Sequence, residues 1–192
     1  MPKYMKGFFW YPTVAAFFII LVIIVSYFLN NKESYVSILN NISLIFHYSF
    51  LGLFIIRVLP NKPNQILAKI TFTVFLALIF FLLITYDNTQ RNTLAFGIAN
   101  FGLMLFCLWY YFQLFNTIPI FNLLREPCFW IITGIFFSMS IHVPIFFSMG
   151  YLKNKISFQN YRLLIAVSLF CYGIMHLFFI KAYICAIHPQ KV

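Results

Sequence analysis

Acidic side chains are scarce in this sequence, which has three Asp and Glu residues in 192 positions. Glu33, Asp87 and Glu126 all lie in or beside polar segments, so no carboxylate is expected near the centre of an apolar span. Proton-driven antiporters and carboxylate-ringed cation channels need buried negative charge, and glycosidase-like hydrolysis needs a pair of carboxylates. The scarcity of acids therefore argues against all three classes of protein.

Charge of either sign is also scarce. Charged residues make up 8% of the chain and hydrophobic residues 63%, whereas soluble domains carry about 25% charged residues. The composition excludes a soluble globular domain. The sequence also lacks a Gly-rich phosphate loop, an H-E-x-x-H motif and a G-x-S-x-G motif, so we expect no enzyme activity.

Cysteine pairs with metal-binding or redox spacing are missing as well. The four cysteines form no C-x-x-C motif, and we expect no disulfide framework among them; they are Cys107, Cys128, Cys171 and Cys185. The net charge of +10 comes from scattered Lys and Arg rather than from a long basic run. Such residues beside membrane spans follow the positive-inside bias and the attraction of anionic lipid headgroups, so we expect the lipid bilayer as a partner and no nucleic acid.

What the sequence does contain is long apolar segments, each close to the roughly 20 residues that a membrane-spanning helix needs. Backbone polar groups inside a bilayer must be satisfied within the segment, which leaves helices as the only option for such runs. We predict an all-α fold, a polytopic transmembrane helix bundle that forms a single integral membrane domain over residues 1–192. Its six spans are expected at about 11–29, 36–59, 67–86, 94–115, 127–149 and 163–187.

Two features of the spans give further expectations. Trp10 and Tyr11 are expected to be interfacial aromatic residues at the start of the first span. Small residues that allow close helix contact are few, and no G-x-x-x-G motif occurs, so we expect a loosely knit bundle.

The distribution of Lys and Arg predicts the orientation. Six spans place both termini on one side. That side would carry Lys3, Lys6, Arg57, Lys62, Lys69, Arg125, Lys181 and Lys191, against Lys32, Arg91, Lys153, Lys155 and Arg162 on the other. Because cytoplasmic loops collect more basic residues, both termini are expected in the cytoplasm.

Three histidines fall near mid-depth in three predicted spans: His47, His142 and His176. An ionisable residue deep in a span is a functional hypothesis by default. Asn40 and His47 belong to one polar stripe at helical spacing, and Tyr172 lies one turn before His176. These side chains should face the bundle interior, because lipid leaves their polar groups unsatisfied. We therefore predict a ligand-binding or proton-sensing pocket lined by all five residues.

Three interpretations of these histidines stay open. They could be ordinary interhelical hydrogen-bonding residues, like any buried Asn or Tyr. They could titrate together and act as a switch or a proton relay. They could also ligate a metal ion, or ligate haem b axially, although no carboxylate is available inside the bilayer as an outer-shell partner for a metal-bound histidine.

One stretch of sequence resembles a known group of proteins. The segment Y-F-Q-L-F at 111–115 is followed by a short loop and by E-P-C-F-W-I-I-T-G-I-F-F at 126–137. This pattern resembles small bacterial multi-pass proteins related to the seven-helix membrane region that precedes some sensor histidine kinases. The positions matching its penultimate span are Pro127, Phe129, Trp130, Ile131 and Gly134, and the second span is loosely similar to an earlier helix through Asn40, Asn41, Tyr48 and Arg57.

The resemblance covers about half of the chain and implies a sensory or signalling-associated protein of a bacterial cytoplasmic membrane. Two departures matter. Six spans are expected rather than seven, and only residues 188–192 follow the last span, so no kinase is expected on this chain. The region around His142 and Pro144 also departs from the pattern, which removes support for a shared ligand pocket.

Together these observations predict a non-enzymatic integral membrane protein, a receptor-like or accessory module that acts through a protein partner or a second copy of itself. On this interpretation the protein needs no cofactor. The alternative is a membrane redox or transport subunit that uses His47, His142 and His176 for haem, metal or proton transfer.

Overall fold

The computed structural model describes residues 7–8, 10–28, 32–59, 61–85, 92–117, 120–152 and 158–187. These residues form helices and contain no strand. The helices are α2 (Trp10–Phe28), α3 (Lys32–Val58), α4 (Lys62–Thr85), α5 (Thr93–Thr117), the 3₁₀ helix η1 (Ile120–Arg125), α6 (Pro127–Leu152) and α7 (Phe158–Ile187). The predicted all-α bundle is confirmed.

Five of these helices are long and apolar enough to cross a membrane: α3, α4, α5, α6 and α7. The sixth, α2, is a shorter apolar helix by the same measure. Its 19 residues give a length of about 28 Å at 1.5 Å per residue, close to the roughly 30 Å of the hydrocarbon core. The chain is thus a multi-pass membrane protein with five long spans and one shorter apolar helix among its described residues.

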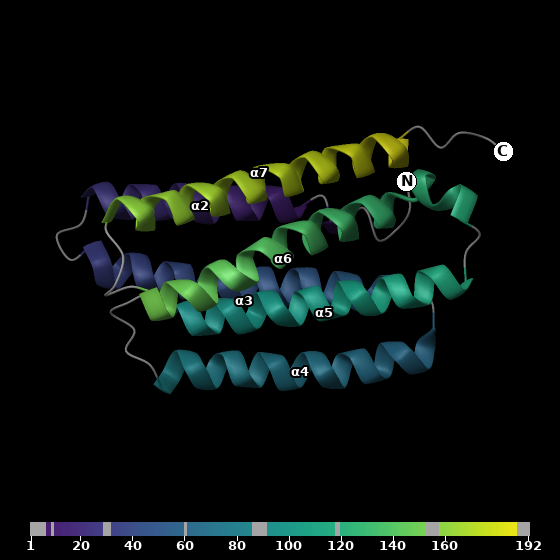
Figure 1. Ribbon diagram of the computed structural model, residues 1–192, viewed down its shortest axis with the longest axis horizontal. Coiled ribbons are helices and arrows are strands. Elements are labelled where there is room, and N and C mark those ends of the chain that lie inside the picture. The colour runs from purple at the N-terminus through teal and green to yellow at the C-terminus, as the bar shows by residue number, and fades with distance from the viewer. Residues whose placement is uncertain are drawn as a thin grey trace.

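The helices run up and down along one axis, with α3, α5 and α6 in the middle of the bundle (Figure 1). Helix α4 lies on one flank against α3 and α5, and α2 and α7 lie on the opposite flank. Helix α2 packs on α3, whereas α7 packs on α6. The end of the bundle where α3 begins is called the Ser37 end below, and the end where α3 stops is called the Arg57 end.

Polar residues fix the connections between helices. Asn92 accepts a hydrogen bond from the Ala95 backbone N–H (3.0 Å) at the start of α5 and donates one to the Leu82 carbonyl in α4 (2.9 Å). Such an N-cap satisfies a backbone donor that the helix leaves unpaired. At the other end of α4, the Gln65 side chain donates to the Leu59 carbonyl (2.7 Å). These bonds join the two ends of α4 to the end of α3 and to the start of α5.

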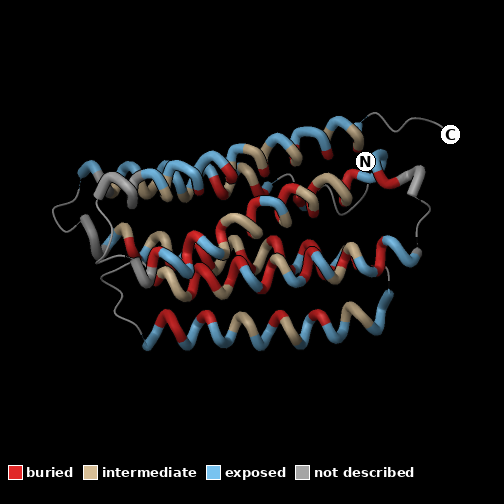
Figure 2. Tube along the Cα trace, in the orientation of Figure 1, coloured by how far each residue is buried: buried red, intermediate tan, exposed pale blue. Residues whose placement is uncertain are grey.

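Buried residues gather on α3, α5 and α6, while the outward faces of α2, α4 and α7 are exposed (Figure 2). Those faces carry large apolar side chains such as Ile19, Ile70, Phe81 and Phe170, all more than half exposed. Apolar surface of this extent is unfavourable in water, and it suits contact with lipid.

Glycines let the helices approach closely. A Cβ at Gly134 in α6 would lie 2.7 Å from Cβ of Phe178 and 3.2 Å from the Met175 carbonyl oxygen in α7. A Cβ at Gly52 in α3 would lie 2.7 Å from the Phe72 ring in α4. Single glycines therefore receive bulky groups of neighbouring helices, and the bundle is more closely packed at these positions than the missing G-x-x-x-G motif predicted.

Lys32 and Arg162 lie near the starts of α3 and α7, at the Ser37 end, and the other five described cations lie at the Arg57 end. Arg57, Lys62, Lys69, Arg125 and Lys181 are all exposed there, in or beside α3, α4, η1 and α7. They are five of the eight basic residues assigned to one side from the sequence, and Lys3, Lys6 and Lys191 lie outside the described residues, as do Arg91, Lys153 and Lys155 of the other group. The cytoplasmic location of that side stays a prediction.

Candidate functional site

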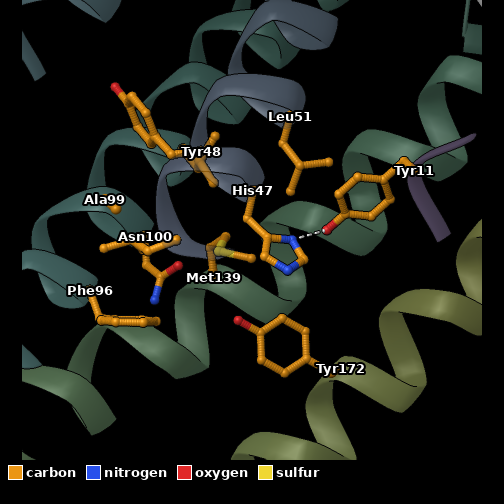
Figure 3. A pocket seen from close by; sticks show the side chains of 11 residues that line it. Tyr11, His47, Tyr48, Leu51, Phe96, Ala99, Asn100, Met139 and Tyr172 are labelled. Atoms are coloured by element: carbon orange, nitrogen blue, oxygen red, sulfur yellow. Dashed lines mark hydrogen bonds between the residues drawn. The ribbon is translucent and has the colours of Figure 1, made fainter. Parts of the chain in front are cut away.

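A small cavity lies at mid-depth in the bundle, where side chains from α2, α3, α5, α6 and α7 meet (Figure 3). Its volume is about 20 Å³, and one buried water needs about 10–15 Å³ on the same scale. The cavity therefore has room for about one water molecule. Its lining consists of Tyr11, Leu44, His47, Tyr48, Leu51, Phe96, Ala99, Asn100, Leu103, Met139 and Tyr172.

The central contact at the cavity joins two helices. Oη of Tyr11 in α2 and Nδ1 of His47 in α3 share a hydrogen bond of 2.7 Å. His47 is half-buried, and its second ring nitrogen is turned toward Tyr172 in Figure 3. His47 therefore has one nitrogen engaged across helices and one directed to the cavity side.

Tyr11 is not the interfacial residue that the sequence predicted. It is fully buried, at 0% exposure, whereas its neighbour Trp10 is 67% exposed. The physical reason is that α2 begins about level with the middle of α3, so its first turn lies inside the bundle. A hydroxyl placed there needs a partner, and His47 provides it.

Phenylalanine rings fill the bundle beside this contact, on the Arg57 side of His47. The ring of Phe8 lies 4.6 Å from Phe54, 5.0 Å from Phe179 and 6.0 Å from Phe50, measured between centroids. These four residues are called the phenylalanine cluster below. The cluster joins Phe8, two residues before α2, to α3 and α7 and contains no polar side-chain atom.

His142 has a different environment. It is fully buried in α6, and its Nδ1 lies 2.6 Å from the Ser138 carbonyl oxygen and 3.1 Å from the Ser138 hydroxyl oxygen. Because a carbonyl oxygen only accepts hydrogen bonds, Nδ1 of His142 donates the proton. The His142 ring also packs against the Tyr172 ring, with centroids 4.3 Å apart. His142 is therefore fixed by its own helix one layer behind the cavity.

The predicted five-residue pocket forms only in part. His47 and Tyr172 line the same cavity, and His142 contacts Tyr172. His176 is half-buried against the edge of the Phe179 ring, 5.6 Å between centroids, and does not line the cavity. Asn40 does not line it either.

The described residues offer less support for a metal or haem site than for the polar pocket. In the part of the chain that the structure describes, no group of three or more His, Cys, Asp or Glu side chains is placed to hold a metal ion. The three histidines thus form no shared metal site there. A haem would also need far more space than a cavity with room for about one water. The four cysteines are all outside disulfides.

Several site residues were missed or misplaced by the sequence argument. Tyr11, Tyr48, Asn100 and Met139 line the cavity, and none was assigned to a pocket. An amide such as Asn100 within a long apolar span is a usable signal for an interior position. Along α3 the sequence favoured Asn40, yet the neighbouring Asn41 is the buried one, at 7% exposure.

The buried polar atoms of the described residues that have no hydrogen-bond partner include Oγ of Ser37, Oδ1 of Asn41, Oη of Tyr48 and Nδ2 of Asn100. An unpaired buried polar group costs about 1–3 kcal/mol. Two of these atoms belong to residues that line the cavity, Tyr48 and Asn100. Figure 3 shows the Tyr48 hydroxyl turned away from His47, so Tyr48 lines the cavity with its side chain while its unpaired oxygen faces elsewhere.

The fold and the site define a class: an α-helical multi-pass membrane protein with a neutral, histidine-containing polar cluster at mid-depth. Compared with models of protein families, with curated proteins and with solved structures, the chain gives no significant match. The resemblance to membrane regions of sensor kinases stays a prediction from the residues quoted above.

Proposed function

We propose that this protein is a non-enzymatic, receptor-like or accessory module of a bacterial inner membrane, which acts through a protein partner or a second copy of itself. The observation that supports this function best is the hydrogen bond between Tyr11 and His47. It attaches the start of a peripheral helix to the centre of the bundle through a group that changes its hydrogen-bonding role when it binds a proton.

A rearrangement of α2 would carry the signal. Helix α2 packs along α3 through apolar side chains, and its first turn is held by His47 and by the phenylalanine cluster. When Nδ1 of His47 gains a proton it changes from acceptor to donor, and the charge disfavours an apolar interior. A proton or a small polar ligand at the cavity therefore shifts the position of the start of α2, and the face of α3 beneath it becomes available to a partner.

The chemistry of the cavity lining supports a binding or sensing role rather than catalysis. Its polar groups are phenol, imidazole and amide, and it includes no Asp, Glu, Lys, Arg, Ser, Thr or Cys. An active site of the usual kinds needs an activated nucleophile, a charged acid–base pair or a metal ion.

Distance measurements between spin labels test the α2 rearrangement. In a background with the four cysteines replaced by alanine, one label pair joins exposed Ile20 of α2 to exposed Val74 of α4. The control pair joins Leu169 of α7 to Val74, which are also exposed. We expect Tyr11→Phe and His47→Gln to shift or broaden the first distance and to leave the second unchanged. An unchanged Ile20–Val74 distance in both variants contradicts the proposal.

The partner is tested separately. Native gel electrophoresis of mildly solubilised membranes, at native expression level, should show the 22.7 kDa chain in a larger assembly. Migration as a monomer alone would contradict the partner-dependent role.

The redox or transport alternative has one supporting observation, the polar cluster at mid-depth, and it favours proton transfer over haem or metal chemistry because the cavity is so small. An absorption spectrum of the purified protein separates the cases. A Soret band would overturn the receptor-like proposal in favour of a b-type cytochrome, and a colourless, metal-free preparation ends the haem and metal alternative.

A further inference from the structure

Three of the unsatisfied polar atoms lie on one face of α3. Ser37, Asn41 and Tyr48 follow one another at four- and seven-residue intervals, which keeps them on the same side of an α-helix. All three are buried, at 3%, 7% and 0% exposure, and each has a polar side-chain atom without a hydrogen-bond partner. We call Ser37, Asn41 and Tyr48 the α3 polar row.

The α3 polar row leads to the cavity. Ser37 lies near the start of α3, and Tyr48 lines the cavity itself. Aromatic side chains on a helix lean toward its N-terminus, so the Tyr48 hydroxyl extends back toward the turn that carries Asn41. On the α5 side of the cavity, Figure 3 shows the Asn100 amide with its oxygen directed toward Met139 and its nitrogen directed toward the Phe96 ring, and Nδ2 has no hydrogen-bond partner.

The Arg57 side of His47 has the opposite character. Leu51 and Ile55 are buried in the second half of α3, and Leu59 is buried directly after its end. The phenylalanine cluster closes the space between α2, α3 and α7. An apolar constriction of this kind excludes water. The polar and apolar halves meet at the level of His47.

We propose that the α3 polar row is a water-binding path, which brings water from the Ser37 end of the bundle to the cavity and ends there beside His47. One water in the cavity lies beside the Asn100 side chain and within reach of His47 and Tyr172. The phenylalanine cluster stops the path, so His47 exchanges protons with the Ser37 side only. The proposed water path does not depend on the rearrangement of α2 that is proposed above.

The chemistry of the row identifies water rather than an ion as the ligand. Asn41 Oδ1 needs a donor and Asn100 Nδ2 needs an acceptor, while the Ser37 and Tyr48 hydroxyls serve as either. A water molecule provides both functions and fits the volume of about 20 Å³. The cavity lining includes no carboxylate and no cationic side chain, so it offers no charge to hold an ion.

Radiolytic hydroxyl-radical footprinting of the full chain in lipid nanodiscs tests the water site, because radicals formed from bound water modify the side chains beside it. Met139 and Met175 are a matched pair, with 2% and 1% exposure. Only Met139 lines the cavity. We expect Met139 to be oxidised several-fold faster than Met175. Equal rates would overturn the proposal.

A pair of neighbouring substitutions tests the route. Asn41→Leu removes a polar group from the row, whereas Asn40→Leu changes an adjacent amide that is half-buried and off the row. We expect Asn41→Leu to lower Met139 oxidation toward the Met175 rate and Asn40→Leu to leave it unchanged. Undiminished Met139 oxidation in Asn41→Leu, with Met175 oxidation at its original rate, would show that water arrives by another route and would overturn the one-sided path.

Ser37→Val provides a second variant in case Asn41→Leu fails to fold. It changes a buried hydroxyl at the entrance of the row, and we expect the same direction of effect on Met139. A Ser37→Val protein with unaltered Met139 oxidation would likewise contradict entry from the Ser37 end.

Discussion

The two helices on one flank of the bundle, α2 and α7, are both apolar and both have lipid-exposed faces, yet they are attached in different ways (Figures 1 and 2). Helix α7 has 30 residues and α2 has 19. The two meet where Tyr11 contacts the ring of Phe179. The contrast lies in how each helix is attached to the middle of the bundle.

Helix α7 is attached through close backbone contact. Gly134 of α6 lies against Phe178 and the Met175 carbonyl of α7, and such contact gains van der Waals energy that lipid does not provide. Helix α2 has its first turn attached by one interhelical hydrogen bond and by ring contacts. In bilayers a hydrogen bond between helices contributes about 0.6 kcal/mol on average, so we expect the attachment of α2 to be the weaker of the two.

The largest effect is expected from filling the α6–α7 contact. In Gly134→Leu the new side chain meets Cβ of Phe178 and a backbone oxygen, and such overpacking costs about 1–3 kcal/mol. We expect a clear fall in the thermal melting temperature in detergent. Gly173→Leu is the control, because nothing lies within 4 Å of a Cβ there. Similar melting temperatures for the two variants would show that α7 is not held by close contact.

A smaller, local effect is expected from Phe8→Ala. It removes the ring that joins Phe50, Phe54 and Phe179, so the start of α2 should open more often. Hydrogen exchange at residues 10–18 should rise about tenfold, which corresponds to about 1.4 kcal/mol, without a matching rise in α6. Phe17→Ala, at an exposed position, serves as the control. Equal changes throughout the bundle would contradict a local attachment.

Tyr11→Phe should have a still smaller effect on the same amides. It removes one hydrogen bond, worth about 0.5–1.5 kcal/mol, and leaves the ring contacts in place. The matched control is Tyr111→Phe, which removes the 2.8 Å bond from Tyr111 to Thr133 between α5 and α6. We expect faster exchange in α2 for the first variant alone. Faster hydrogen exchange of the α2 amides in Tyr111→Phe as well would contradict a specific role of the Tyr11–His47 bond in attaching α2.

The smallest effect is expected from Ser138→Ala. His142 keeps its 2.6 Å bond to the Ser138 carbonyl and loses only the 3.1 Å contact to the hydroxyl. We expect a change in stability within about 0.5 kcal/mol and no change in α2 exchange. A large loss of stability would mean that the hydroxyl, rather than the backbone, positions His142.

The helices were predictable from the sequence because each is a long apolar run that ends at a polar segment. The predicted span at 36–59 lies within four residues of α3 (Lys32–Val58) at each end, and the predicted span at 127–149 lies within three residues of α6 (Pro127–Leu152). The length of an apolar run determines whether a helix can cross the bilayer. The start of α2 was also close, and what the sequence did not reveal was its depth in the bundle.

The side-chain contacts were less predictable, because apolar residues cover both the lipid-facing and the interior side of each helix. In soluble proteins a polar face shows which side is outside, and here that contrast is weak. The choice between Asn40 and Asn41 depends on where α4 and α5 pack against α3, which no residue of α3 specifies. Tyr11 was misplaced for a related reason, since aromatic residues beside the first apolar run are typical of an interface.

The contact between the start of α2 and α7 also affects the order of folding. The Tyr183 hydroxyl donates to the Phe8 carbonyl at 3.3 Å across 175 residues of sequence, whereas the α5–α6 and α6–α7 contacts join helices that follow one another in the chain. Contacts between distant segments form late because their loop-closure entropy is large. The contacts between Phe8 and α7 can therefore form only after α7, the last helix, has been synthesised. Phe8 completes the core late in folding for this reason.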